Sequence, residues 1–330
     1  IPEGQTVIYS GTDSIVYDKI VVEGSFTIAP SDADVSLTVG TIVVEKGGVL
    51  DVTTDNTEFG IEIVIEGALD HTIDPEEQLV GIVSLEGNLT ITGEPVVTKM
   101  VPLKQDAVSG SDSFVVEGFV SHDFAVGGEL ILPDTQTGLN IGHWNFLNLG
   151  VYVDQTESCI IASIGANIME EGEGTLITCE SPFTYSHSAG SNLGSITRSI
   201  TIRTSPDSSD NGHILHTGTG KFDVRNTRIE NLGRTTVDVI DSTVMTPVED
   251  VHFPLDQQWA QMNVITLGAN QIARYALHAH HSLVESYFSG NALLYSPRDG
   301  CVAHNSRVHI RDNVIVGADG TGVFLEDATE

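Results

Sequence analysis

Short β-strand segments, separated by glycine, asparagine and aspartate, run through the whole chain and constrain its fold more than any other feature. Apolar and polar residues alternate in segments such as KIVVEGSFTI and GIVSLEGNLTI, which is the pattern of half-buried strands. No long segment has apolar residues at the roughly 3.6-residue spacing of a helix. The sequence therefore predicts an all-β protein.

The pattern changes along the chain and predicts three regions. Residues 1–135 have alternating strands with glycine at the turns, which predicts a β-sandwich or a short β-solenoid. Residues 136–197 are expected to form an irregular β connector. In residues 198–330 very short strands are separated by Asn, Asp and Gly, which predicts a right-handed parallel β-helix with asparagine at its corners. Because the last segment has no polar cap, we expect the β-helix to continue beyond Glu330.

The charge of the chain is acidic and uneven. Its 14 basic and 46 acidic residues give a net charge of -32, which disfavours binding to nucleic acid. All nine arginines lie at or after Arg198, so the second part is better suited to a carboxylated or sulfated ligand. A soluble acidic surface without a specific ligand is the alternative explanation of the charge.

An extracellular or cell-surface location is expected, and cysteine usage and hydropathy are compatible with it. The three cysteines are too few for a disulfide framework, although one bridge between Cys159 and Cys179 is compatible with their placement. No apolar run reaches the roughly 20 residues of a membrane span, so direct insertion into a membrane is not expected. Ile1 begins a strand-like segment, so any signal peptide is already removed.

Histidines are concentrated in the second part of the chain. Eight of the twelve lie at or after His213, and four of these fall between His278 and His304. On a strand His278 and His280 would point to the same side, where both imidazoles can reach one ion or one sugar ring. We therefore predict His278 and His280 as metal ligands, with calcium or zinc as the cation.

An alignment of three segments predicts how the site is assembled. If equivalent strands of successive coils begin at Arg274, Asp299 and Thr321, equivalent residues stack in columns, because neighbouring coils lie about 4.8 Å apart. One predicted column contains His280, Asn305 and Asp327, and the next contains Ala279, His304 and Glu326.

These columns predict a mixed histidine and carboxylate site. The predicted catalytic residues are His280, His304, Glu326 and Asp327. The predicted substrate-binding residues are Arg274, Asn305, Trp259 and Asp299. The alternative is that stacked polar residues satisfy one another along the solenoid while His278 packs inside.

Three motifs carry a resemblance to a known family: G-R-T at Gly233–Thr235, R-Y-x-L-H-x-H at Arg274–His280 and F-L-E-D at Phe324–Asp327. With the glycine-rich strands of the first half, they resemble the family of the cell-migration-inducing hyaluronan-binding protein and the transmembrane cell-surface hyaluronidase, in its bacterial branch. The resemblance implies an eight-glycine domain before a parallel β-helix, an acidic extracellular polysaccharide as partner, and calcium dependence. Where the family usually has a histidine before F-L-E-D, this sequence has Thr321.

Two functions from different classes follow from these observations. The first is an enzyme that depolymerises a hyaluronan-like acidic glycan, as a glycoside hydrolase or a polysaccharide lyase. The second is a non-catalytic surface or appendage protein, in which the β-helix is an adhesive rod attached to further domains or subunits. A metal-dependent isomerase or epimerase is a minor third alternative.

Overall fold

All secondary structure in the described part of the chain is β. The computed structural model describes residues 1–54, 58–75, 77–136, 153–169, 172–234, 244–247, 262–266 and 274–326. These residues form strands and no helix, so the predicted all-β class is confirmed. It follows that no described segment is a helix capable of crossing a membrane.

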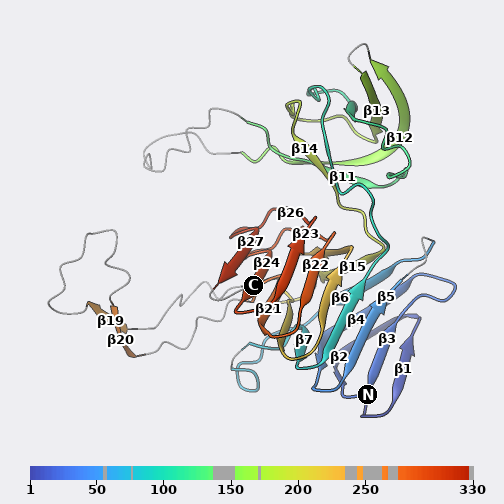
Figure 1. Cartoon of the computed structure of the whole chain (residues 1–330). Coiled ribbons are helices and arrows are strands. Elements are labelled where there is room, and N and C mark those ends of the chain that lie inside the picture. Colours follow the sequence, from blue (N-terminus) through green and yellow to red (C-terminus); the bar gives the residue numbers. More distant parts are fainter. Residues whose placement is uncertain are drawn as a thin grey trace.

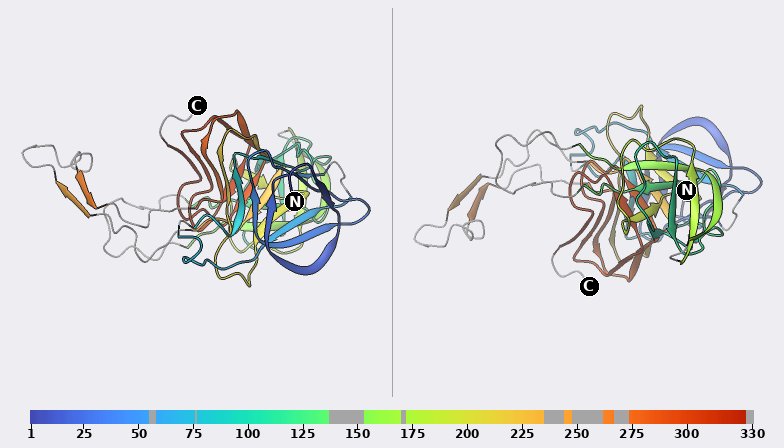
Figure 2. Two further views of the ribbon diagram at one scale, coloured as in Figure 1. Left: turned by 90° about the horizontal axis from the view of Figure 1, so that it is seen from below. Right: turned by 90° about the horizontal axis from the view of Figure 1, so that it is seen from above.

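Most strands belong to a stack of parallel coils, the coil stack, which runs from the blue strands to the red strands in Figure 1. Each strand pairs in parallel with its equivalent in the next coil, and the paired strands form three faces. The orange and red C-terminal strands lie to one side of the blue ones in both views of Figure 2. The first face consists of β1 (Thr6–Tyr9), β3 (Ser25–Ile28), β5 (Val49–Thr53), β8 (Asn88–Thr92), β17 (Phe222–Arg225), β22 (Ser286–Ser289) and β25 (Val308–Arg311).

The other two faces diverge from one long strand. β4 (Val35–Val44) pairs with β2 (Thr12–Val22), and its two halves pair with different strands of the next coil. The second face continues through β6 (Ile61–Ile65), β15 (Ile200–Thr204), β18 (Thr227–Glu230), β23 (Ala292–Leu294) and β26 (Val314–Val316). The third face continues through β7 (Gly81–Leu85), β16 (Ile214–Gly218), β21 (Leu277–Ser282), β24 (Cys301–His304) and β27 (Val323–Glu326). The parallel pairing predicted after residue 198 is thus confirmed, and the handedness of the coils stays a prediction.

The sequence forms coils because its alternate apolar residues stack inside. On the third face one buried column contains Ile42, Ile82, Ile214, Leu277 and Cys301. Each coil therefore extends the same core, and the strand period of two keeps polar residues outside.

Glycine and asparagine act at the corners, as predicted. A β-carbon on Gly48 would overlap the carbonyl oxygen of Val22, and one on Gly220 would overlap that of Gly87, because successive coils approach closely there. At other corners Asn226 and Asn305 adopt left-handed φ angles of 50° and 45°.

A separate antiparallel unit, the insert, interrupts the coil stack. Its strand order is β10–β13–β12–β11–β14–β9, and a bridge between Leu103 and Val116 joins the two ends of the order. The strands are β9 (Met100–Pro102), β10 (Ser113–Glu117), β11 (Glu129–Leu132), β12 (Glu157–Met169), β13 (Gly172–Cys179) and β14 (Asn192–Ser195). β19 (Val244–Pro247) and β20 (Met262–Thr266) form a further antiparallel pair.

The structure groups the strands differently from the predicted division at residues 135 and 197. The strands before residue 93 belong to the same coil stack as those after residue 199, because β6, β7 and β8 pair directly with β15, β16 and β17. The strands between them form the insert. The change in sequence pattern at residue 198 therefore marks the return of the chain to the coil stack.

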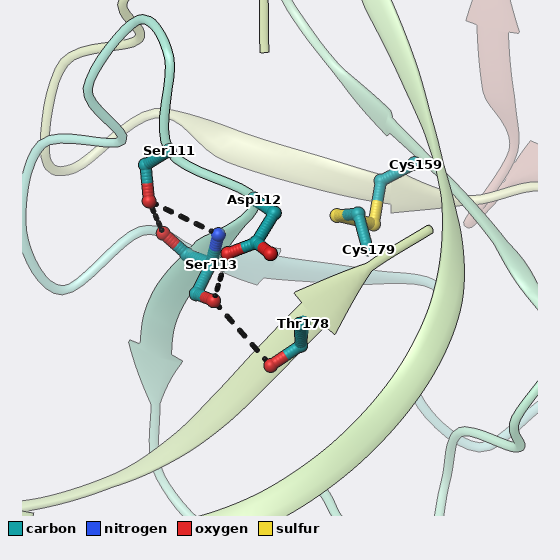
Figure 3. Close-up of a disulfide and its surroundings, with 6 residues drawn as sticks. All are labelled: Ser111, Asp112, Ser113, Cys159, Thr178 and Cys179. Atoms are coloured by element: carbon teal, nitrogen blue, oxygen red, sulfur yellow. Dashed lines mark hydrogen bonds between the residues drawn. A yellow bond between two sulfur atoms is a disulfide. The ribbon is translucent and has the colours of Figure 1, made fainter. Parts of the chain in front are cut away.

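A disulfide joins two neighbouring strands of the insert. Cys159 on β12 is bonded to Cys179 on β13, which confirms the bridge considered from the sequence. In Figure 3 the hydroxyl of Ser113 donates to the carboxylate of Asp112 and lies near that of Thr178, beside the bridge. The third cysteine, Cys301, is buried in the coil stack as a free thiol.

Removing this disulfide is expected to destabilise the insert by about 3 kcal/mol, since the bridge closes a loop with a sequence separation of 20 residues. Urea unfolding of the C159S/C179S double variant measures the loss. Reduction of the wild type with dithiothreitol provides the control and should give the same shift, because Cys301 forms no disulfide. An unchanged unfolding midpoint in both experiments would contradict the prediction.

Candidate functional site

The third face of the coil stack carries histidines on its outer side. On β21, Leu277 and Ala279 belong to the core, so His278 and His280 point away from it. The two histidines therefore lie on the same side of the strand, as predicted. Because β21 and β24 pair in parallel, each outward residue of β21 lies beside an outward residue of β24.

One outward column joins three of the predicted catalytic residues. His280 pairs with His304 on β24, which in turn pairs with Glu326 on β27. The ring centroids of His280 and His304 are 4.9 Å apart, and Nδ1 of His304 lies 3.9 Å from Oε2 of Glu326. Both histidines are partly buried and Glu326 is exposed. Two imidazoles and a carboxylate thus meet at the surface.

The predicted alignment of β21 with β24 was wrong by one residue. The structure pairs Ala279 with Ala303, and His280 with His304 rather than with Asn305. Coils differ in length because their corners contain different numbers of residues, and a slip of one residue exchanges the inner and outer sides of a strand. The observed register brings the histidines closer together than the predicted one.

His281 belongs to the same group, and sequence reasoning missed it. Strand alternation would turn it away from His280, but its φ of 54° is left-handed and breaks the alternation. Its ring stacks on that of His280, with centroids 4.4 Å apart, and lies 5.0 Å from the ring of His304. The doubled histidine in LHAHHS is the only sequence signal. We refer to His280, His281 and His304 as the histidine cluster.

His278 is buried beside the histidine cluster, with 5% of its surface exposed. Its ring is edge-on to Tyr275 at 4.8 Å and to His280 at 5.4 Å. Burial, and secondly His280, lowers the pKa of His278 to about 3. Among the described residues, the ring nitrogens of the histidine cluster lie close enough together to hold one metal ion. Of the two predicted metal ligands, His280 belongs to this cluster and His278 does not.

His280 offers a neutral imidazole at neutral pH. Burial, followed by His281 and His304, lowers the pKa of His280 to about 4. A neutral imidazole has one nitrogen lone pair, which can accept a proton or bind a metal ion.

Other predicted site residues have structural roles close to the cluster in sequence. Nε of Arg274 donates to the carbonyl oxygen of Glu77 at 2.9 Å. The buried carboxylate of Asp299 accepts the backbone N–H of Thr321 in the next coil. Asn305 forms the corner after β24. Two predicted residues lie outside the described residues: Trp259 and Asp327.

A second candidate site is a polar groove of about 760 Å³ between the second face and the insert. Its lining includes two paired arginines: Arg203 Nε lies 2.7 Å from Glu62, and Arg228 Nη1 lies 2.7 Å from Glu129. Arg198 also lines the groove and is 9% exposed.

Arg198 differs from the other groove arginines in its partners. Its Nε and Nη1 donate to the carbonyl oxygens of Gly290, Ser195 and Thr197, and its Nη2 has no partner in the described part of the chain. Burial, and secondly Arg228, lowers the pKa of Arg198 to about 10. The sequence indicated an arginine-bearing half suited to anions, but not this groove, because it lies between residues far apart in the chain.

Comparison with known proteins identifies the first part of the chain. Residues 1–104, from β1 to β9, match the G8 domain. The eight-glycine domain predicted from the sequence is therefore confirmed for these residues.

The whole chain has distant relatives. It is 25% identical to human (Homo sapiens) fibrocystin-L and 24% identical to mouse (Mus musculus) fibrocystin-L; both alignments cover 100% of this chain and 8% of the relative. Among solved structures, the tailspike gp61 of Pseudomonas phage phi297 matches 88% of this chain and 40% of its own, with 10% identity and a TM-score of 0.23, too low for a comparison of folds. The chain thus contains a G8 domain at residues 1–104 and is distantly homologous over its full length to fibrocystin-L.

Proposed function

We propose that this is an extracellular protein that depolymerises an acidic, hyaluronan-like polysaccharide at the histidine face of its coil stack. The observation that carries the proposal is the contact of His280, His304 and Glu326 across three successive coils. The disulfide between Cys159 and Cys179 supports an extracellular location, since such bonds persist in oxidising compartments. The sequence resemblance to hyaluronidases supports the choice of substrate.

The proposed chemistry is proton transfer. Cleavage of a glycosidic bond requires one group that donates a proton and one that accepts it, whether water or the sugar ring is deprotonated. His304 and Glu326 face each other at 3.9 Å and reach solvent, so a glycan laid across β24 and β27 meets both. His280 supplies a neutral imidazole next to them.

Exchange of His304 or Glu326 for glutamine is expected to lower the cleavage rate at least about 100-fold, the typical contribution of general acid–base catalysis. Size analysis of hyaluronan, chondroitin and other uronic-acid polymers measures the rate. Absorbance near 232 nm, which reports an unsaturated product, would identify a lyase. H309Q is the matched control, because His309 also faces a glutamate, Glu285 at 2.7 Å, but on the first face. If the wild type cleaves none of these polymers, with or without zinc or calcium, the proposed enzyme is ruled out.

Non-catalytic polysaccharide binding is the second candidate, and the arginine groove favours it. Arg198, Arg203 and Arg228 line one open groove, where guanidinium groups can contact carboxylates or sulfates of a glycan. Binding to immobilised polymer distinguishes the candidates. Under this function R203A weakens binding, whereas E326Q leaves it unchanged and no polymer is shortened.

A further inference from the structure

We propose that His280, His281 and His304 bind one divalent transition-metal ion, with Zn²⁺ as the best match. Each of the three contributes a ring nitrogen that lies within 4.8 Å of those of the other two. The proposal concerns metal binding alone and does not depend on the protein being a glycan-cleaving enzyme.

The backbone brings the three rings together by two different means. Parallel pairing of β21 with β24 places His304 beside His280. The left-handed backbone of His281 then turns its ring onto the same side, where it stacks on His280 with 13° between the ring planes. The ring of His304 stands edge-on to both of the others. Two rings from the end of one strand and one from its neighbour thus surround a single point.

Glu326 supplies the kind of partner that metal-binding histidines usually have. Its Oε2 lies 3.9 Å from Nδ1 of His304. A proton on Nδ1 directed at this carboxylate leaves Nε2 of His304 as the metal ligand, and the carboxylate raises its basicity.

His278 provides an independent indication of a ligand at this place. It is 5% exposed, and neither of its ring nitrogens has a hydrogen-bond partner in the described ranges. Buried polar groups normally have a partner, and an isolated buried imidazole is costly. Its ring lies 5.4 Å from that of His280, so a water molecule bound to the metal ion could provide the missing hydrogen bond.

The donor atoms select the class of metal. Imidazole nitrogens suit zinc, copper and nickel, whereas calcium takes roughly six to eight oxygen ligands. Three protein ligands with a fourth position left for water is the arrangement of catalytic zinc sites. Of the two cations expected from the sequence, the cluster therefore favours zinc.

Small side-chain movements complete the geometry. Zinc–nitrogen bonds of about 2.1 Å in a tetrahedral site place the nitrogens roughly 3.4 Å apart. Because the ring nitrogens lie within 4.8 Å of one another, no pair has to close by more than about 1.4 Å. His281 is exposed, and His280 and His304 are partly exposed, so this closure requires no movement of the buried core.

Titration of the full, metal-stripped chain with Zn²⁺ in a calorimeter tests the proposal, and visible absorption of the Co²⁺ form reports tetrahedral coordination. We expect one equivalent to bind. Substitution of one ligand, H281Q or H304Q, should weaken binding by more than about 100-fold, because loss of an outer-shell partner alone costs about 10–100-fold. E326Q should weaken it by about tenfold, in line with an outer-shell role.

The exposed H309Q variant is the control and should bind Zn²⁺ like the wild type. Circular dichroism in EDTA checks that H281Q and H304Q retain the fold. Equal Zn²⁺ affinity in the wild type, H281Q and H304Q would overturn the proposal, as would a Co²⁺ spectrum typical of octahedral coordination. Binding is measured without polysaccharide, so loss of the proposed enzyme activity and loss of the metal site are separate results.

Discussion

Replacement of Arg234 by methionine is expected to lower the free energy of unfolding of the coil stack by roughly 3–5 kcal/mol, the loss typical of a broken buried charge pair. Arg234 is buried, with 7% of its surface exposed. Its Nη1 donates to the carbonyl oxygens of Val80 and Asn211, and its Nη2 donates to those of Glu77 and Leu79. These bonds hold the segment before β7 against the coil that follows β18.

The methionine variant also removes an ion-pair partner from a buried carboxylate. Glu77 is 1% exposed, and its Oε2 lies 3.8 Å from Nε of Arg234. Once the guanidinium is gone, the buried carboxylate loses this ion pair and the carbonyl oxygens lose their donors.

Urea unfolding compares R234M with two other variants. R234K keeps the charge but not the planar set of donors, so its stability should lie between those of the wild type and R234M. R311M makes the same chemical change on an exposed strand and should shift stability by less than about 0.5 kcal/mol. Equal unfolding midpoints for R234M and R311M would refute the structural role of Arg234.

Local sequence patterns predicted the strands and corners, because these depend on neighbouring residues. Alternation of apolar and polar residues reports which side of a strand is buried, and the left-handed Asn226 and Asn305 lie at corners as expected. The insert was not predicted. Recognising it requires the pairing of β8 with β17 across more than 100 residues, and alternation does not identify the partner of a strand.

Three residues that meet in the candidate site, His280, His304 and Glu326, were singled out from the sequence, but their assembly was not predicted. The equivalence of the last two coils, 22 residues apart, is correct, because Cys301 pairs with Val323. The step before it was predicted as 25 residues, whereas Leu277 and Cys301 are 24 apart (301 − 277). His281 was missed for a related reason, since a single left-handed residue at a strand end reverses the expected side. The geometry of the corners thus decides both the register of β21 with β24 and the side on which His281 lies. The periodicity of the sequence does not reveal that geometry.

Stability is expected to fall as pH decreases below about 6.5, because two core histidines cannot accept a proton in the folded protein. Burial, and secondly Arg234, lowers the pKa of His213 well below its usual value. Burial likewise lowers the pKa of His216, which stacks on Phe222, to about 4. In the unfolded chain both imidazoles take up protons near pH 6.5. Between that pH and the folded pKa the unfolded state therefore binds more protons, and each histidine removes about 1.4 kcal/mol of stability per pH unit.

Urea unfolding in EDTA between pH 7.5 and pH 5 measures this slope. The window lies above the ordinary pKa values of Asp and Glu, so carboxylates contribute little there. H216Q removes one titrating group and should reduce the slope by about 1.4 kcal/mol per pH unit, because the contributions of His213, His278 and His280 remain. If H216Q and the wild type lose stability in parallel as the pH falls, His216 does not remain neutral in the core, and its stacking on Phe222 does not exclude the proton.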